Sequence, residues 1–402
     1  MNKDPKTLVE TELAVGVEHL VPVDELVEKL ETAEKEKRSL RVKLGIDPSA
    51  PHLTLGHSVP LRKMRQFQDL GHTGVMIVGD FTRRIGDPSG RSSTRALMSE
   101  EDIHRFMETY KEQAFKILDP QRTEVRYNSE WLGAMSLAEV IHLSAKYTVA
   151  RMLERDDFAK RYAEGHPISV LEFLYPLVQA YDSVAIEADV ELGGSDQLFN
   201  LLVGRDIQRE YGLAPQVVMT VPLLIGLDGE RAMSQTTGNY VGISEAATEM
   251  YGKLLSIPDS LIGDYYIYLT DVELVQVESL IEESPRDAKR RLARQIVTMY
   301  HDADAAAEAE AEFDRIHIHH DRPSDISELS LDRALLKDDG TIWVIDLLQA
   351  SGLVSSRGEA KRLVQQGGVR VNEKKIDSPD LDLSFSAPMF VQVGKRSFVE
   401  LV

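Results

Sequence analysis

The stretch Lys43-Leu-Gly-Ile-Asp-Pro-Ser-Ala-Pro-His-Leu-Thr-Leu-Gly-His57 decides the fold that this sequence predicts. It begins within an apolar strand over 41–46, breaks at Asp47-Pro48 and enters a helical pattern near Gly56. A strand that turns directly into a helix presents backbone N–H groups at the helix N-terminus, where anions bind. Gly56 lets a flat ligand approach the backbone, and His57 is a donor for a phosphate. These residues fit an ordinary strand–helix turn with a surface histidine equally well.

The alternation of strand and helix continues beyond this stretch. Apolar residues recur at helical spacing over 57–70, and the apolar run 75–78 is typical of a buried parallel strand. Strand, helix and strand in succession form a βαβ unit, whose ligand site lies at the carboxyl ends of the strands. A helix over 197–211 and a strand over 216–220 predict a second such half. The fold class is therefore α/β with a parallel, Rossmann-like sheet.

The composition narrows the class of protein. The chain has 402 residues, of which 43% are apolar and 28% charged, and it has no cysteine, which excludes disulfides and thiolate metal sites. The formal net charge of −20 repels nucleic acid at long range. A polyanion would therefore have to bind to a local basic surface. Residues 336–402 carry 9 Lys+Arg and 9 Asp+Glu, so this part has no net charge, whereas the remainder of the chain is acidic. No signal peptide or membrane-length apolar run is visible, and a cytoplasmic location without membrane attachment is expected.

The pattern divides the chain into four parts. Residues 1–40 are helical and charged, with Asp24 as the expected N-cap of a helix. The α/β part covers 41–245 with helices inserted over 136–164, an all-helical part covers 246–325, and a small part with two helices and a strand pair covers 336–402. The histidine-rich segment 317–323 fits a solvated linker better than a metal site, since no partner at ligand spacing is evident.

Three further clusters of polar residues follow predicted strands or lie on a helix. The loop 79–90 holds two aspartates suited to an ammonium group, although a surface loop has the same composition. Tyr175, Gln179 and Asp182 share one helix face at i, i+4 and i+7, where a hydroxyl, an amide and a carboxylate can bind an amine or a phenol. This spacing alone fits a core helix with a buried tyrosine as well. In Leu192-Gly-Gly-Ser-Asp-Gln197 the glycines admit a ligand and Asp196 can accept from ribose hydroxyls.

The four clusters in this order resemble the tyrosyl-tRNA synthetase family, class I enzymes, and the string Tyr175-Pro-Leu-Val-Gln-Ala-Tyr-Asp-Ser-Val-Ala185 is highly specific. The resemblance covers nearly the whole chain and is closest to the bacterial branch that ends in an S4-like RNA-binding domain. It implies a Rossmann-like catalytic domain, a helical anticodon-binding domain and the S4-like domain in a cytoplasmic homodimer. It also implies that the protein joins tyrosine to ATP, which arrives as its magnesium complex, and passes the tyrosyl group to tRNA, with no metal held by the protein.

The resemblance assigns roles residue by residue. Substrate binding falls to six residues, with Tyr175, Gln179 and Asp87 on the α-amino group, Asp182 on the phenol hydroxyl, and Asp47 and Gln197 near the amino acid and the reacting carboxylate. ATP binding falls to Gly56, His57, Gly194, Asp196 and Gln235. The catalytic residues are His57, Thr54 and Arg231, and the RNA-binding residues of the tail are Arg357, Lys361, Arg362 and Lys374.

Two departures from the family pattern concern the ATP end. Thr54 stands where the HIGH motif has its first histidine. In the loop 229–240, which occupies the place of KMSKS, Ala232 and Gln235 replace both lysines, and Arg231 stands one place early as a possible substitute. Removing one such donor to developing charge typically lowers the rate about 10²–10³-fold.

Three functions are compatible with this sequence. The first is a tyrosine–tRNA ligase with an altered ATP loop. The second is a diverged paralogue that activates or binds tyrosine, or an analogue, outside translation. The third is a catalytically weak RNA-binding regulator. The S4-like tail favours a function linked to tRNA, whereas the missing lysines favour the other two.

Overall fold

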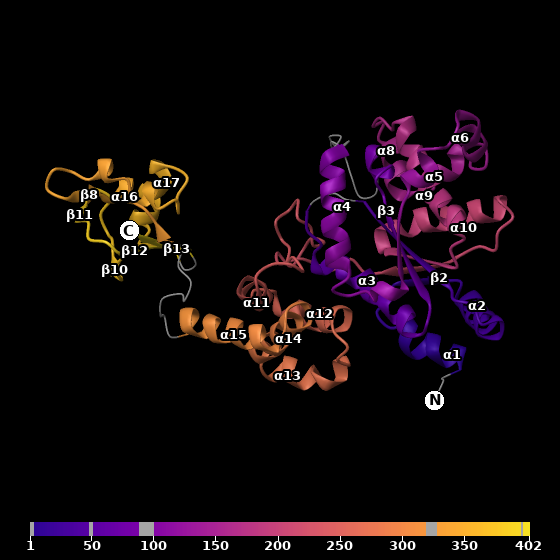
Figure 1. The fold of residues 1–402 in the computed structure, drawn as a ribbon, viewed down its shortest axis with the longest axis horizontal. Helices are drawn as coiled ribbons and strands as arrows, with labels where there is room; N and C mark the ends of the chain where they lie inside the picture. The colour runs from indigo at the N-terminus through magenta and orange to yellow at the C-terminus, as the bar shows by residue number, and fades with distance from the viewer. Residues whose placement is uncertain (1–3, 48–50, 88–99, 319–327, 395–396) are drawn as a thin grey trace. The chain divides into compact units, whose positions relative to one another are not determined.

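The computed structural model describes residues 4–47, 51–87, 100–318, 328–394 and 397–402 (Figure 1). The chain forms two compact units, Met1–Glu310 and Ala311–Val402. Residues 88–90 of the predicted ligand loop and 319–323 of the histidine-rich segment lie outside the described residues. None of the helices in the described ranges has both the length and the apolarity of a membrane span.

The first unit is built on a six-stranded sheet with the order β1-β6-β5-β2-β3-β4. Five of its strands are parallel, and β1 alone pairs antiparallel, at the edge beside β6. Their bounds are His19–Val21 (β1), Arg41–Ile46 (β2), Thr73–Val78 (β3), Thr123–Tyr127 (β4), Val190–Gly194 (β5) and Val217–Val221 (β6). The order confirms the predicted Rossmann-like class, and it reverses between β2 and β5, which is where such sheets bind ligands.

The strands are apolar because helices cover both faces of the sheet. Every residue of β6 and all but the first residue of β3 are buried, as in parallel sheets generally. Helix α3 (Leu55–Asp69) connects β2 to β3, and α4 (Glu100–Ala114) precedes β4. The helices between β4 and β5 are α5 (Ser129–Leu132), α6 (Leu137–Ser144), α7 (Val149–Met152), α8 (Asp156–Ala163) and α9 (Val170–Ala185), and α10 (Leu198–Glu210) connects β5 to β6. Of these helices, α6, α7 and α8 fall within 136–164, where the sequence predicts inserted helices.

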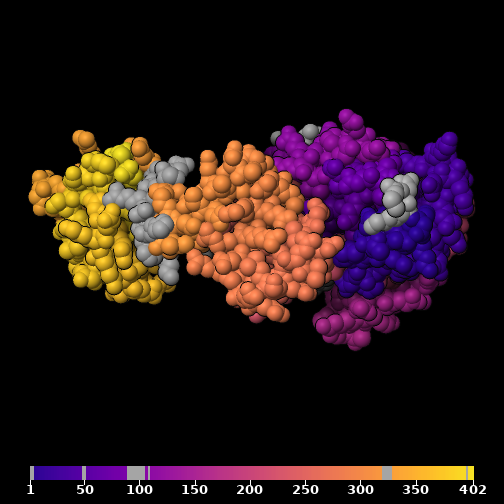
Figure 2. All heavy atoms as spheres, turned by 90° about the horizontal axis from the view of Figure 1, so that it is seen from below, coloured from indigo at the N-terminus to yellow at the C-terminus, as the bar shows by residue number. Residues whose placement is uncertain are grey.

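The N-terminal segment differs from its prediction. It holds α1 (Pro5–Leu8), a π-helical turn over Val9–Leu13 and α2 (Val23–Glu36), but also β1, which extends the sheet. The N-terminal part of the chain forms the indigo surface in Figure 2. The strand was missed because its hydrogen-bond partners lie in β6, about two hundred residues away in the chain. The prediction for Asp24 was wrong: Pro22 is the N-cap of α2, and Asp24 lies within the first turn, where its charge suits the helix dipole.

A helical region completes the first unit. Its helices are α11 (Ala247–Leu255), α12 (Ile262–Leu269), α13 (Glu278–Glu283) and α14 (Pro285–Tyr300), followed by α15 (Ala303–His317), in which the first unit ends. Tyr251, Tyr265, Leu292 and Ile296 are fully buried and supply its core.

The second unit has its own core and both kinds of secondary structure. Helices α16 (Val344–Ala350) and α17 (Arg357–Gln365) pack with a five-stranded sheet of order β10-β9-β12-β13-β7 around buried residues such as Leu347, Val364 and Val391. The strands are β7 (Glu328–Leu329), β9 (Val369–Val371), β10 (Lys374–Lys375), β12 (Met389–Val393) and β13 (Ser397–Leu401), with a separate pair β8 (Thr341–Trp343) and β11 (Asp382–Ser384). The two helices and the strand pair near 372–375 agree with the prediction, and the other strands add to it.

Candidate active site

A cavity of about 310 Å³ lies at the carboxyl ends of the strands, where the strand order reverses. It is lined by the ends of β2, β3, β5 and β6, by the start of α3 and by one face of α9. Of the predicted site residues, ten line it: Asp47, Gly56, His57, Asp87, Tyr175, Gln179, Asp182, Gly194, Asp196 and Gln197. Its volume falls at the lower end of the range for small-molecule sites.

One end of the cavity is rich in acceptor oxygens. The Tyr175 hydroxyl donates to Asp47 Oδ2 at 2.9 Å, and the Thr82 hydroxyl donates to Asp47 Oδ1 at 2.8 Å. Burial raises the pKa of Asp47 to about 6, although these two hydrogen bonds oppose the shift. Within the described part of the chain, the buried Oε1 of Gln179 has no hydrogen-bond partner. An unpartnered buried oxygen beside carboxylates suits a ligand that brings N–H donors.

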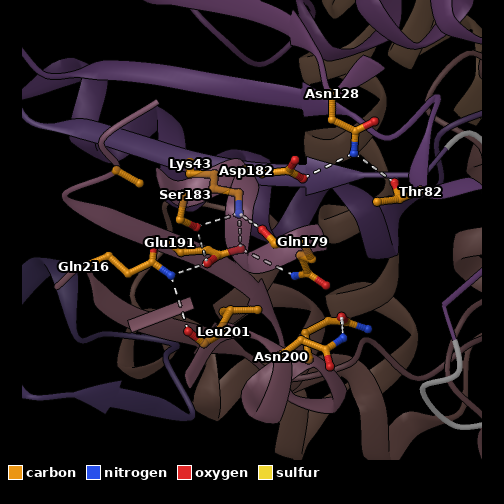
Figure 3. A network of polar contacts seen from close by, with 12 residues as sticks. Lys43, Thr82, Asn128, Gln179, Asp182, Ser183, Glu191, Asn200, Leu201 and Gln216 are labelled. Atoms are coloured by element: carbon orange, nitrogen blue, oxygen red, sulfur yellow. Dashed lines mark hydrogen bonds and ion pairs between the residues drawn. The ribbon is translucent and has the colours of Figure 1, made fainter. Parts of the chain in front are cut away.

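The Asp182 carboxylate is buried deeper on the same face of α9 and is 3% exposed. Trp131 Nε1 donates to its Oδ1 at 2.7 Å. Asn128 Nδ2 donates to its Oδ2 at 3.3 Å, a contact that Figure 3 shows. Burial raises the pKa of Asp182 to about 7, while the charge of Lys43 and the two hydrogen bonds oppose that rise. Sequence reasoning missed Trp131 and Asn128. The position of Asn128 directly after β4, at the edge where ligands bind, was the available signal.

Gln197 and Asp87 meet in the same cavity, and the charge of Asp87 acts on both Asp47 and Tyr175. Gln197 Nε2 donates to Asp87 Oδ2 at 2.7 Å, and Asn200 Nδ2 donates to Gln197 Oε1 at 3.1 Å. Asn200 is 1% exposed, so it holds the Gln197 amide in one orientation from behind. The glycines of β5, Gly193 and Gly194, leave room for a ligand against the backbone.

Thr54 and His57 form the start of α3. The Thr54 backbone N–H donates to His57 Nδ1 at 3.2 Å, and the Thr54 hydroxyl lies 2.9 Å from the same atom. Burial lowers the pKa of His57 to about 4, so the ring is neutral at pH 7. Because Nδ1 accepts, Nε2 carries the proton and is the donor of this ring. Thr54 is fully buried and does not line the cavity, whereas Gly56 and His57 do.

The loop 229–240 places a short apolar side chain at the cavity. Ala232 and Met233 line it, but Arg231 and Gln235 do not. Arg231 Nε pairs with Asp228 Oδ2 at 2.9 Å on the exposed side of the loop, and the Gln235 amide donates to the backbone oxygen of His52. Among the described residues that line the cavity there are four aspartates and neither lysine nor arginine.

Basic side chains gather on the second unit around one aromatic ring. Arg357 and Lys361 of α17 both lie over the ring of Trp343, and Arg357 also pairs with Asp346 at 2.7 Å. Lys361, Arg362 and Lys374 are exposed. This arrangement presents a cationic surface with an aromatic centre, and Trp343 is a member that sequence reasoning missed.

The chain matches two family models. Residues 35–317 match tRNA synthetases class I (W and Y), and residues 342–387 match the S4 domain. The chain is 50% identical over 392 residues to a tyrosine–tRNA ligase from Moorella thermoacetica, covering 96% of this chain and 94% of that protein. It is also 50% identical over 394 residues to a tyrosine–tRNA ligase from Thermotoga maritima, covering 96% of this chain and 95% of that protein.

Solved structures share the fold. The tyrosyl-tRNA synthetase from Archaeoglobus fulgidus, complexed with L-tyrosine, superposes with a TM-score of 0.59 at 22% identity, over 76% of this chain and 98% of that one. A C-terminally truncated mitochondrial tyrosyl-tRNA synthetase from Coccidioides posadasii gives a TM-score of 0.61 at 24% identity, over 77% of this chain and 92% of that one.

Proposed function

The chain belongs to the class I tRNA synthetases of the tryptophan and tyrosine group, and we propose from its cavity how it recognises its amino acid and handles ATP. Its activity is that of a tyrosine–tRNA ligase, with tyrosine, ATP and tRNA as substrates. The tyrosine carboxylate attacks the α-phosphate of ATP to form tyrosyl adenylate and pyrophosphate, and the tyrosyl group then passes to tRNA. An S4 domain follows the catalytic unit.

One observation carries the proposed binding mode: a hydroxyl, an unpartnered amide oxygen and a buried carboxylate from one face of α9 line a single cavity. The tyrosine ammonium group lies at the end with Tyr175, Gln179 and Asp87, where Gln179 Oε1 gains the donor that it lacks. The phenol lies at the end with Asp182. In this orientation every buried polar group of the substrate meets a partner of opposite character.

Asp182 supplies the discrimination against phenylalanine. The phenol hydroxyl donates to its carboxylate, beside the donors from Trp131 and Asn128. A site that hydrogen-bonds a substrate hydroxyl rejects the analogue without it by about 10⁴–10⁵, because phenylalanine leaves the buried carboxylate without that donor.

The nucleotide lies toward α3 and β5. The neutral His57 ring donates a hydrogen bond from Nε2–H to the phosphates. Gly56 and Gly194 have no side chain, so the nucleotide can lie against the backbone there, and Asp196 accepts a hydrogen bond from a ribose hydroxyl. Gln197 lies near the reacting carboxylate, with its amide held by Asn200. We also propose that ATP binds as its magnesium complex. The magnesium ion would then offset the phosphate charge that the residues of the cavity do not neutralise.

The loop 229–240 is a KMSKS loop without its lysines, and we expect it to weaken the activation step. Ala232 presents a methyl group where a cation would stabilise the departing pyrophosphate. Arg231 is engaged with Asp228 and does not line the cavity. Arg83 is buried and its charge acts on Asp47, at the amino-acid end. Losing a preorganised donor lowers the rate about 10²–10³-fold.

The finer features of assembly are also proposals. The inserted helices expose several large apolar side chains, namely Leu137, Ile141, Val149, Tyr162 and Val170, each at least 60% exposed. Exposed apolar side chains of this size are typical of an interaction surface, and a homodimer would cover them. Arg357, Lys361, Arg362 and Lys374 bind tRNA phosphates and shape. The expected location is the cytoplasm. We also propose that residues 41–245 form the catalytic domain, 246–325 the anticodon-binding domain and 336–402 the S4-like domain, after an N-terminal segment over 1–40.

Two assays on the purified full chain test this function. Tyrosine-dependent exchange of pyrophosphate into ATP measures activation, and charging of tRNA with labelled tyrosine measures transfer. Exchange with charging is the expected result, at a rate lowered by the altered loop. Exchange without charging would favour a paralogue that activates tyrosine outside translation, which the missing lysines make the second candidate. Absence of both, together with RNA binding, would indicate a regulator.

A further inference from the structure

A buried ion pair lies behind the amino-acid cavity. Lys43 on β2 is 0% exposed, Glu191 on β5 is 1% exposed, and Lys43 Nζ lies 2.8 Å from Glu191 Oε1. Taking two charges out of water is unfavourable, and apolar residues of similar volume often stabilise a fold equally well. Stability therefore does not explain why these charges occupy the centre of the sheet.

Lys43 makes two further hydrogen bonds, both to α9. Its Nζ donates to the backbone oxygen of Gln179 at 2.9 Å and to Ser183 Oγ at 2.7 Å. An ammonium group has three N–H bonds, and Glu191, Gln179 and Ser183 use all three. Asp182 lies between the two α9 residues, so the ammonium fixes the part of the helix that faces the cavity (Figure 3).

Glu191 determines which way the Gln179 amide turns. Its carboxylate accepts from Ser183 Oγ at 3.1 Å and from Gln216 Nε2, and Gln179 Nε2 approaches its Oε1 at 3.5 Å. A carboxylate only accepts, so it attracts the donor end of the amide. The acceptor end, Gln179 Oε1, is a buried oxygen for which the described residues supply no hydrogen-bond partner.

Lys43 also acts on Asp182. The charged groups that face the Asp182 carboxylate are Lys43 from β2 and Glu191 from β5, while Trp131 and Asn128 supply neutral donors. Burial raises the pKa of Asp182, the charge of Lys43 lowers it, and the charge of Glu191 raises it by less. The net effect of the pair therefore favours the ionised carboxylate.

We propose that the Lys43–Glu191 pair is a positioning device for amino-acid selection. It turns the Gln179 amide so that an acceptor meets the substrate ammonium, and it keeps Asp182 in the form that best accepts from a phenol hydroxyl. This inference rests on the tyrosine-binding mode proposed above. It adds two residues that touch neither substrate, yet set the polarity at both ends of the cavity.

The test uses the full-length chain with Lys43→Met and Glu191→Leu together, which removes both charges and keeps the volume. Calorimetry measures tyrosine affinity from pH 6 to pH 9, and competition measures phenylalanine affinity. Both ligands share the ammonium and the carboxylate, so the ratio of their affinities reports on the phenol alone. We expect this ratio to fall about tenfold at pH 7, as a charge-assisted hydrogen bond becomes a neutral one, and to recover as the pH rises. Both affinities also fall because the Gln179 amide is released.

A matched control removes another ion pair anchored on α9. Arg161→Met with Glu172→Gln breaks a 2.5 Å pair outside the cavity lining, and glutamine preserves the capping box of the helix. Its affinity ratio and pH profile should match those of the wild type. A folded Lys43→Met, Glu191→Leu chain with the wild-type ratio and profile would overturn the proposal.

A second variant keeps the proposal testable if the double variant does not fold. Glu191→Gln removes the repulsion on Asp182 and leaves Lys43, so the midpoint of the ratio should move to lower pH, opposite to the double variant. An unchanged midpoint would contradict the inference. A wild-type chain that binds no tyrosine would overturn the function itself and this inference with it, whereas tyrosine binding with an unaltered ratio in both variants would overturn the inference alone.

Discussion

Replacing Asp182 by asparagine should stabilise the ligand-free protein in a pH-dependent way. Burial raises the pKa of this carboxyl from its ordinary 3.8 to about 7. A shift of about 3 units corresponds to ~4 kcal/mol by linkage. This free energy disfavours the folded state whenever the carboxyl is ionised. Asparagine has no charge to bury, but its amide nitrogen would face Asn128 Nδ2, and losing that hydrogen bond costs about 1 kcal/mol.

The sign of the pH dependence follows from the raised pKa. Below pH 3.8 the carboxyl is protonated in both states and contributes nothing. As the pH rises from about 4 to about 7, the unfolded chain loses this proton first, so the folded state of the wild type is progressively destabilised. Above pH 7 the penalty is complete, and Asp182→Asn should be more stable than the wild type by about 3 kcal/mol. Near pH 4 it should be slightly less stable.

Urea unfolding of both chains at pH 4, 6 and 8 without tyrosine measures this difference. Asp228→Asn is the matched control of opposite sign. Desolvation raises the pKa of Asp228, but hydrogen bonds from Asn239 and from backbone N–H groups outweigh it and hold this pKa well below its usual range. Removing the Asp228 carboxylate should therefore destabilise the folded state most at neutral pH. A free-energy difference between Asp182→Asn and the wild type that is the same at pH 4 and pH 8 would refute the reasoning.

Three other perturbations address the remaining proposals. Ala232→Lys with Gln235→Lys should raise the rate of pyrophosphate exchange by about 10² or more by returning cations to the loop; no increase would mean that another group already supplies the charge. Arg357→Ala with Lys361→Ala should weaken tRNA binding in filter assays and reduce its salt dependence, leaving pyrophosphate exchange unchanged. Ile141→Asp should convert a dimer to a monomer in sedimentation, since it places a charge among the exposed apolar side chains of the inserted helices; a wild-type monomer would remove the dimer proposal.

The polar face of α9 could be predicted because its information is local. Tyr175, Gln179 and Asp182 fall on one side of any helix with this sequence, and the turns after β2, β3 and β5 must lie at one edge of a parallel sheet. Local spacing, together with the family resemblance, therefore identified ten of the residues that line the cavity.

The partners of those residues could not be predicted, because they come from distant segments. Trp131 reaches Asp182 from α5, and Glu191 meets Lys43 across two paired strands that are separated in the chain by nearly half of the first unit. Lys43 stands in the stretch that identified the fold, yet a lysine in an apolar strand carries no sign of its partner. Edge strand β1 was missed for the same reason, since its three residues are extended only through β6.

The loop 229–240 shows why the two halves of the cavity tolerate change differently. Its shape depends on backbone contacts, including Met233 N–H to the oxygen of Leu224 and the bridge between Ile225 and Ala232. The segment after the loop pairs in the same way with the start of α3, since Leu55 N–H donates to the oxygen of Val241. Such contacts do not depend on which side chain occupies position 232. Replacing a lysine in this loop therefore removes a positive charge without changing the shape of the loop. Gln179 and Asp182, in contrast, depend on a buried side-chain network that a single substitution disturbs. For this reason the two-lysine variant should keep the fold and the tyrosine affinity of the wild type, and a change in tyrosine affinity larger than its change in exchange rate would contradict this separation.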